Sequence, residues 1–180
     1  MKTTLRKTIV LTVLSLAFLS TSSFAQLSAS ADVLISLIKG LSIQNQGGSN
    51  IDFGEVIVTS SAQTPQVTPS NGAHFLVTGH PGKNVTISFS NVTLSNSAWV
   101  STYNAGSSST MTFVPSMEET GKEGTYSSGT PSSVSSGNSV ALVNDHGIGY
   151  LNLWVGGSIT VAADQDQGDY VGDFTVTVAY

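Results

Sequence analysis

The side chains that could carry out acid–base or nucleophilic chemistry are few and scattered in this chain of 180 residues. His74 lies in an alternating apolar stretch, His80 lies in a turn signal, and the third histidine, His146, directly follows Asp145. Adjacent side chains on a strand point to opposite faces, so we do not expect Asp145 and His146 to act as a dyad. The sequence has neither a Gly-x-Ser-x-Gly elbow nor a His-Glu-x-x-His motif. We therefore expect no catalytic residues, no cofactor and no enzymatic activity.

A short acidic stretch, with Asp164, Asp166 and Asp169, is the one candidate for a metal site. Carboxylates two residues apart can converge on a calcium ion. A twelve-residue calcium loop has a side-chain oxygen ligand at its fifth position and a glutamate at its twelfth. Counted from Asp164, these positions hold Gly168 and Thr175, so both ligands are missing. A polar turn before the last strand explains the same residues. The sequence leaves calcium binding open.

Four aromatic side chains could stack on the apolar face of a sugar, as aromatic rings do in binding sites. Trp154 lies in an apolar alternating segment and is expected in the core. The better candidates are Trp99 and Tyr103, with Tyr126 as the fourth aromatic residue. The sequence places no ligand site among them, so adhesion stays a possible additional role.

Residues 1–25 have the features of a secretory signal peptide. A basic start is followed by an apolar run from Ile9 to Leu19 and by small residues that end at Ala25. The run is too short to span a membrane, and we expect export with no membrane insertion of the mature chain. Removing residues 1–25 leaves three lysines against eleven acidic residues, a net charge of −8, which argues against nucleic acid as a partner. The chain has no cysteine, hence no disulfide.

Residues 168–180 give the clearest strand signal in the chain. Apolar side chains occupy every second position apart from Gly172, and Thr175 and Thr177 stand between them. Such a segment is a strand with one apolar face. Because a long apolar strand at the end of a sheet exposes an edge that aggregates unless it is paired, we expect this strand to have a partner.

A second alternating segment begins where the mature chain is expected to start. Its apolar residues take the odd positions from Leu27 to Leu37 and resume at Leu41. This run is longer than one strand of a small domain usually is. We therefore expect residues 26–37 to be an N-terminal extension that can pair elsewhere, and residues 38–180 to form the domain. One long bent edge strand is the alternative.

Between these two segments the pattern predicts an all-β domain. Short alternating runs are separated by turn signals, and no segment has a convincing helical apolar period, which favours a β-sandwich or barrel. Gly79-His80-Pro81-Gly82 predicts one hairpin turn and Gly156-Gly157 another, while residues 115–138 predict a polar insertion with little to bury. The expected strands cover residues 51–59, 74–78, 84–89, 91–94, 110–114, 139–143, 149–155 and 158–162.

Several of these segments, taken in order, resemble an uncharacterised bacterial secreted domain family, domain of unknown function four-four-zero-two, which is grouped with pilus subunits and adhesins. The pieces that carry the resemblance are IDFG at residues 51–54, AHFLVTG at 73–79 with Pro81-Gly82, VGGSITV at 155–161, and GDYVGDFTVTVAY at 168–180.

The wider resemblance is to chaperone–usher pilins, in which an immunoglobulin-like sandwich lacks its final strand. A periplasmic chaperone fills the gap first, and the N-terminal extension of the next subunit then replaces it. Gly168 stands twelve residues before Tyr180, which is the spacing of the pilin C-terminus. Here the tyrosine is last rather than penultimate, and the pilin disulfide is absent. These differences leave a self-complemented version of the fold open.

The resemblance implies a fimbrial structural subunit at the surface of a Gram-negative bacterium, polymerising by donor-strand complementation. Its partners would be copies of itself or other pilus subunits, with a periplasmic chaperone and an outer-membrane usher. The alternative is a self-complemented, monomeric secreted module that binds carbohydrate or another surface ligand. The residues expected in subunit contacts are Leu27, Ala29, Ala31, Val33, Ile35, Leu37, Phe174, Val176, Val178 and Tyr180.

Overall fold

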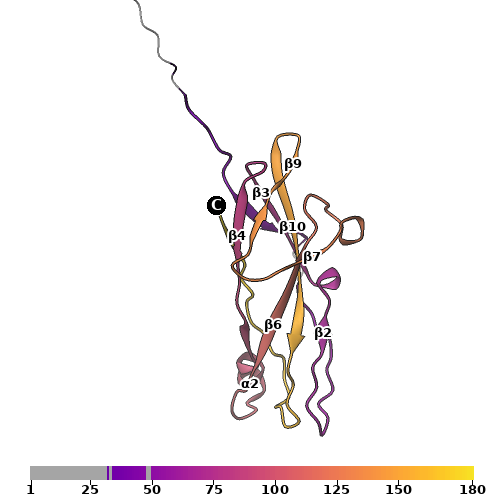
Figure 1. Ribbon diagram of the computed structural model, residues 1–180. Helices are drawn as coiled ribbons and strands as arrows, with labels where there is room; N and C mark the ends of the chain where they lie inside the picture. The colour runs from indigo at the N-terminus through magenta and orange to yellow at the C-terminus, as the bar shows by residue number, and fades with distance from the viewer. Residues whose placement is uncertain (1–31, 33, 48–49) are drawn as a thin grey trace, which may run out of the picture. The chain divides into compact units, whose positions relative to one another are not determined.

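A computed structural model describes residues 32, 34–47 and 50–180 (Figure 1). The chain divides into two units, Met1–Ser36 and Leu37–Tyr180. In the first unit, the described residues Asp32 and 34–36 belong to no strand or helix. The expected signal peptide, residues 1–25, lies outside the described residues, and so do four members of the expected donor segment: Leu27, Ala29, Ala31 and Val33.

The second unit is built around one long strand, β10 (Ile148–Ile159), which belongs to an eight-stranded antiparallel sheet. Strand β10 pairs with β3 (Ala73–Gly79) on one side and with β6 (Thr110–Glu119) on the other. Beyond them lie β1 (Ser42–Asn45), next to β3, and β5 (Val92–Ser95), next to β6. The sheet is completed by β2 (Gln66–Val67) and β9 (Val143–Asp145), both paired with β10, and by β7 (Ser132–Val134), paired with β6.

A second sheet has three strands and faces the first. Strand β4 (Asn84–Ser88) lies in its centre, between β8 (Ser139–Ala141) and β11 (Thr177–Ala179). Apolar side chains of both sheets meet in the main core cluster, which contains Val77, Val85, Ile87, Met117, Val134, Leu142, Leu151, Leu153 and Val155. The expected all-β sandwich is confirmed.

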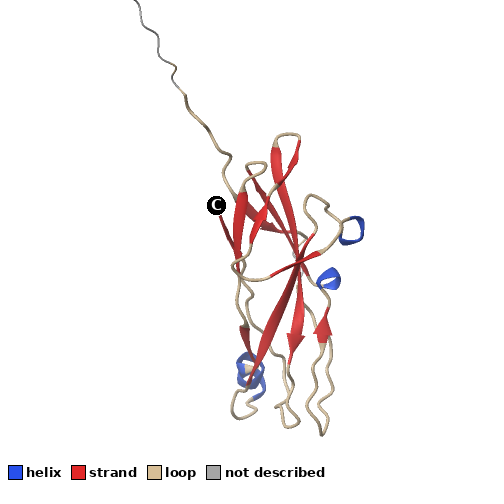
Figure 2. Ribbon diagram, in the orientation of Figure 1, coloured by secondary structure: helices blue, strands red, loops and turns tan. Residues whose placement is uncertain are grey.

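Helices play a small part in this structure (Figure 2). The α-helix α2 (Ser97–Tyr103) follows β5, and two single 3₁₀ turns, η1 (Pro69–Asn71) and η2 (Tyr126–Ser128), lie in connections. In the described part of the chain, no helix has the length and apolar character that crossing a membrane requires.

Gly156 and Gly157 lie inside β10, so the prediction of a hairpin turn at this pair was wrong. A Cβ atom on Gly156 would lie 2.2 Å from the carbonyl oxygen of Val67, and one on Gly157 would lie 2.4 Å from that of Val114. Glycine within a strand often marks such a close approach of two backbones. The two glycines therefore let β2 and β6 come close to β10, which continues straight through them.

The polar insertion expected at residues 115–138 is shorter in the structure. Strand β6 continues to Glu119, and β7 pairs with it. Met117 and Val134 are buried in the main core, 3% and 5% exposed. Each is a single apolar residue among polar ones, and one face of a strand needs only every second residue to be apolar. The polar composition of residues 115–138 therefore gave no sign of the end of β6 or of β7.

The connection between β6 and β7 packs on the outer face of the larger sheet, over Trp154. The indole Nε1 of Trp154 donates a hydrogen bond to Thr120 Oγ1 at 2.9 Å. The ring of His74 stacks on the indole with centroids 3.8 Å apart, and the ring of Tyr126 meets it edge-on at 5.7 Å. The Tyr126 hydroxyl donates to Glu118 Oε2, and this hydrogen bond raises the pKa of Tyr126. Trp154 is thus covered by its neighbours rather than available to a ligand.

Replacing Thr120 by valine tests this packing. The Thr120→Val change keeps the shape of the side chain but leaves the buried indole N–H without its partner, so the free energy of unfolding should fall by about 1–3 kcal/mol. Urea denaturation followed by Trp fluorescence measures the loss. Thr112→Val, at an exposed position of β6, is the control and should change stability by no more than about 0.5 kcal/mol. Equal losses in the two variants would contradict the assignment.

Candidate functional site

Two segments of this domain lie outside the strand ladders, and Gly54, with a φ of 63° and its N–H bonded to Asp52 Oδ1, makes a local turn in the first of them. Residues 50–58 and residues 172–176 belong to no strand ladder, whereas Val171 forms an isolated bridge with Ser95 of β5. The segment expected to be one long strand, residues 168–180, is thus paired as a strand only at Thr177–Ala179. Edges that expose N–H and C=O groups are templates for pairing with another strand.

The two segments run in opposite directions. Gly168 lies against the Trp99 ring of α2, so the C-terminal segment starts at the α2 end of the domain. It runs from there to Phe174, whose ring is 6.4 Å from that of Phe75 in β3. Residues 50–58 approach the α2 end instead, because the Ile57 carbonyl accepts a hydrogen bond from Gln63 beside the last part of β10.

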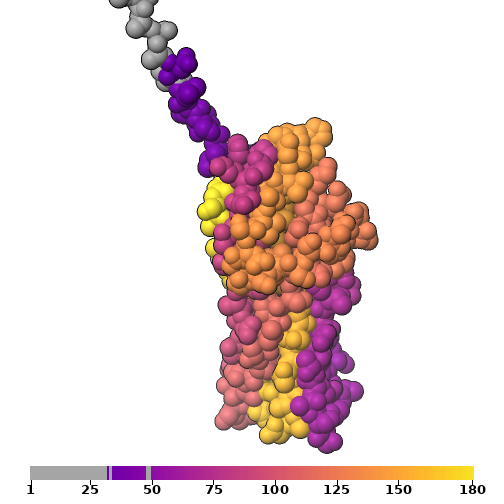
Figure 3. All heavy atoms as spheres, viewed as in Figure 1, coloured from indigo at the N-terminus to yellow at the C-terminus, as the bar shows by residue number. Residues whose placement is uncertain are grey.

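Between the two segments lies an open groove with a volume of about 910 Å³. Its walls come from segments far apart in the sequence, seen as purple, pink and yellow bands side by side at the α2 end of the domain in Figure 3. The floor is apolar and belongs to the larger sheet and its continuation: Val92, Leu94, Met111, Phe113, Ile159 and Val161. Of these six, only Phe113, Ile159 and Val161 are fully buried.

Three phenylalanine rings meet in the middle of the groove. Phe53 comes from one unpaired segment, Phe174 comes from the other, and Phe113 lies on the floor between them. The centroid of the Phe113 ring is 6.0 Å from that of Phe53 and 6.1 Å from that of Phe174, both edge-to-face. These separations are typical of contacting aromatic pairs. We call these three residues the phenylalanine cluster.

The chain matches the family model described as Domain of unknown function (DUF4402) over residues 41–180. The protein belongs to the DUF4402 family. The expected membership in this family is confirmed, and the matched range covers both sheets and the groove. Residues 26–37 precede the match. No curated protein matches the chain.

The α2 end of the DUF4402 domain is held by a buried asparagine that sequence reasoning missed. Asn96 is 0% exposed; its Oδ1 accepts the Ser109 N–H at 2.7 Å and its Nδ2 donates to the Gln167 carbonyl at 3.0 Å. Gln165 adds hydrogen bonds to Ser109 Oγ and the Tyr170 hydroxyl. Asparagine is common in turns, so its type gives no sign of this role.

The three aspartates considered for calcium are not brought together. Among the described residues, no group of three or more His, Cys, Asp or Glu side chains is placed to hold a metal ion. Asp166 and Asp169 instead lie on the rim of the groove, with Asp173. The chain makes a turn at Asp164, where the Gln165 N–H donates a hydrogen bond to the Ala162 carbonyl at 3.2 Å.

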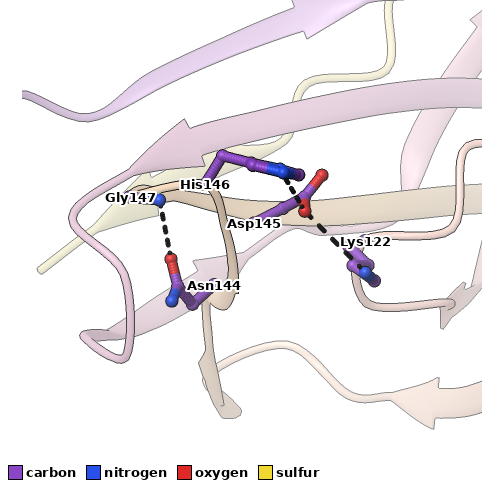
Figure 4. Close-up of polar contacts among 5 residues, drawn as sticks. All are labelled: Lys122, Asn144, Asp145, His146 and Gly147. Atoms are coloured by element: carbon purple, nitrogen blue, oxygen red, sulfur yellow. Dashed lines mark hydrogen bonds and ion pairs between the residues drawn. The ribbon is translucent and has the colours of Figure 1, made fainter.

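Asp145 and His146 contact one another, contrary to the expectation that they point apart (Figure 4). His146 Nδ1 lies 2.9 Å from Asp145 Oδ1, and Lys122 Nζ lies 3.9 Å from the same oxygen. Strand β9 ends at Asp145, and His146 has a φ of 49° in the turn, so strand alternation no longer applies. The pair lies on an exposed hairpin, where the His146 side chain is 94% exposed.

The expected contact residues of the C-terminal segment divide between three places. Phe174 lines the groove, whereas the half-buried Val176 and Val178 pack against the main core. Tyr180 is 46% exposed. Its hydroxyl donates to the Lys39 carbonyl at 2.7 Å and accepts the His80 N–H at 2.7 Å. In the expected donor segment, Ile35 and Leu37 are 81% and 78% exposed.

The Tyr180 hydroxyl is predicted to hold the first residues of the domain. The Tyr180→Phe change removes both hydrogen bonds, so unfolding free energy should fall by about 0.5–1.5 kcal/mol and the His80 amide should exchange faster with deuterium. Tyr103→Phe is the control, since that side chain is 66% exposed, and it should shift stability by less than about 0.5 kcal/mol. An unchanged His80 exchange rate would show that the hydroxyl does not hold this turn.

Proposed function

We propose that this protein is the structural subunit of a surface fimbria and polymerises by donor-strand complementation. The observation that carries the proposal is the groove between two unpaired, oppositely running segments. A strand placed there would take main-chain hydrogen bonds from both edges and bury alternate side chains on the apolar floor. This is β-augmentation, in which the backbone supplies affinity and the pockets supply specificity.

Residues 26–37 of a second copy have the properties that such a groove requires. Their apolar residues alternate from Leu27 to Leu37, and the described members Leu34 and Ile35 are exposed, 91% and 81%. An exposed apolar segment is a hazard for a monomer, and so is an open apolar groove, because both promote aggregation. Joining the two in an assembly removes both hazards. Leu37 then belongs at the edge of the subunit contact.

The position of Lys39 favours a chain of subunits rather than a closed pair. Lys39 is hydrogen-bonded to Tyr180 and His80. Tyr180 is the end of the C-terminal segment that lies away from α2, because the segment starts beside α2 at Gly168. The donor residues 26–37 and the residues that line the groove come from different parts of the chain, so the proposed contact joins unlike surfaces of two subunits. Contacts between unlike surfaces are heterologous and continue into open filaments when the rotation does not close.

The same proposal includes export and assembly factors. Residues 1–25 direct the chain through the inner membrane, a periplasmic chaperone covers the groove until assembly, and an outer-membrane usher passes subunits to the surface of a Gram-negative bacterium. The filament needs no enzyme activity and no cofactor. A role in adhesion would place a ligand on the subunit surface in addition to its contacts.

A self-complemented binding module is the second candidate. Because Lys39 lies beside Tyr180, the extension of the same chain could fold back along the free side of residues 172–176. In that case the protein is monomeric, and Trp99 with the 66% exposed Tyr103, 5.1 Å apart, is a candidate ligand surface at the α2 end. Sedimentation of the mature protein separates the two candidates.

The Ile35→Asp variant tests donation between subunits. A carboxylate in an apolar groove without a partner costs several kcal/mol, so filaments should be lost while the domain keeps its β-rich circular dichroism spectrum. Electron microscopy and sedimentation measure the loss.

The matched control is Ser36→Asp, which adds the same charge one residue along, on the opposite face of the donor strand. It should leave filaments intact. Normal filaments from Ile35→Asp would remove the proposal, and a monomeric unmodified protein would favour the self-complemented module.

A further inference from the structure

The groove differs in character along its length. In the middle, Phe53 and Phe174 reach from opposite edges to the same floor ring, Phe113, so the phenylalanine cluster occupies the space between the edges. In the β5–β6 pairing, Phe113 lies opposite Val92, and Met111 lies opposite Leu94. Since β5 leads directly into α2, the Leu94–Met111 pair is nearer to α2 than the rings are.

Toward α2 the floor of the groove is aliphatic, whereas its edge there carries polar residues and a tyrosine: Gln165, Asp166, Gln167, Asp169 and Tyr170. Val56, Leu94 and Met111 are each partly exposed there, and Val161 forms the floor beyond Ile159. The floor of the groove thus consists of an aromatic part at the phenylalanine cluster and of partly exposed aliphatic side chains toward α2.

The proposed donor segment has a matching gradient of side-chain size. Its inward positions begin with Leu27 and continue with two alanines, Ala29 and Ala31. They then become larger, with Val33 and Ile35. A small side chain fits over a filled floor, whereas a larger one needs an open pocket, because packed interiors do not tolerate extra methylenes.

Building on the function proposed above, we infer that Ala29 and Ala31 of a second copy lie over the phenylalanine cluster and set both the register and the direction of the donated strand. Val33 and Ile35 then lie on the aliphatic surface toward α2. In this direction the donor runs toward α2, antiparallel to residues 168–176 and parallel to residues 50–58.

The extension of the same chain cannot reach this arrangement. Lys39 is held beside Tyr180. If the extension of the same chain paired with the C-terminal segment from that point, each residue before Lys39 would lie opposite one residue before Tyr180, because paired strands have the same rise per residue. Six residues separate Tyr180 from Phe174, which brings Val33, six residues before Lys39, to the rings. The alanines would then face the aliphatic section, and the sizes would not match. The size pattern therefore selects a second copy.

Two substitutions of the donor test the role of the alanines, with the chain produced full length in its native host. Ala31→Leu should lower the number of filaments roughly tenfold or more, because the added methylenes have no space over the rings. Val33→Leu, which introduces the same leucine side chain two residues along and adds one carbon atom where Ala31→Leu adds three, should leave assembly nearly unchanged. Neither residue belongs to the 41–180 domain match, and circular dichroism of the isolated protein checks that the fold is kept. Equal assembly of both variants would overturn the inference.

Engineered disulfides test the direction, since the chain has no cysteine of its own. The double variant Val33→Cys/Val56→Cys should give a ladder of covalent multimers on a non-reducing gel, and Leu27→Cys/Val56→Cys should give none. A ladder from the Leu27 pair alone would reverse the direction and overturn the inference while leaving the fimbrial function intact. A disulfide within one monomer from the Leu27 pair, or no multimer from either pair, would overturn both.

Discussion

The paired backbone of β10 is the interaction on which the rest of this structure depends. Strand β10 has partners along both edges, β3 and β2 on one side and β6 on the other. Gly156 and Gly157 keep this pairing continuous where β2 and β6 approach most closely. With β10 fixed, the large sheet becomes a platform whose inner face must be covered. The three-stranded sheet covers the part that holds the main core, and the phenylalanine cluster lies beyond it.

The groove follows from this unequal cover. The main core has nine buried residues with side chains from both sheets, whereas the cluster around Phe113 has three, and its neighbours Val92, Leu94 and Met111 stay partly exposed. Burying such surface on association is a strong driving force. A strand added between residues 50–58 and 172–176 would bury it and also satisfy two backbone edges. Apolar floor and unpaired edges together make one strand a better occupant than a small molecule.

The sequence predicts the local features of this fold better than its spatial ones. Alternation identified the all-β class and the half-buried positions Phe174, Val176 and Val178, because period two follows directly from strand geometry. The hairpin turn predicted at Gly156-Gly157 is absent, because glycine occurs both in turns and where two backbones approach closely, and the sequence does not distinguish the two. Residues 115–138 misled because Met117 and Val134 are isolated in a polar stretch. The groove was not predictable, since it depends on which distant segments stay unpaired, and Asn96 gives no local signal.

The hydrogen bond between the last side chain and Lys39 joins residues 141 positions apart. Contacts of such high sequence separation form late and slowly in folding. The pairing of β11 with β4 and the hydrogen bond of the Tyr180 hydroxyl therefore form only after the sheets between them have taken shape. The side chain that fastens the start of the domain is in this way among the last parts of the fold to be put in place.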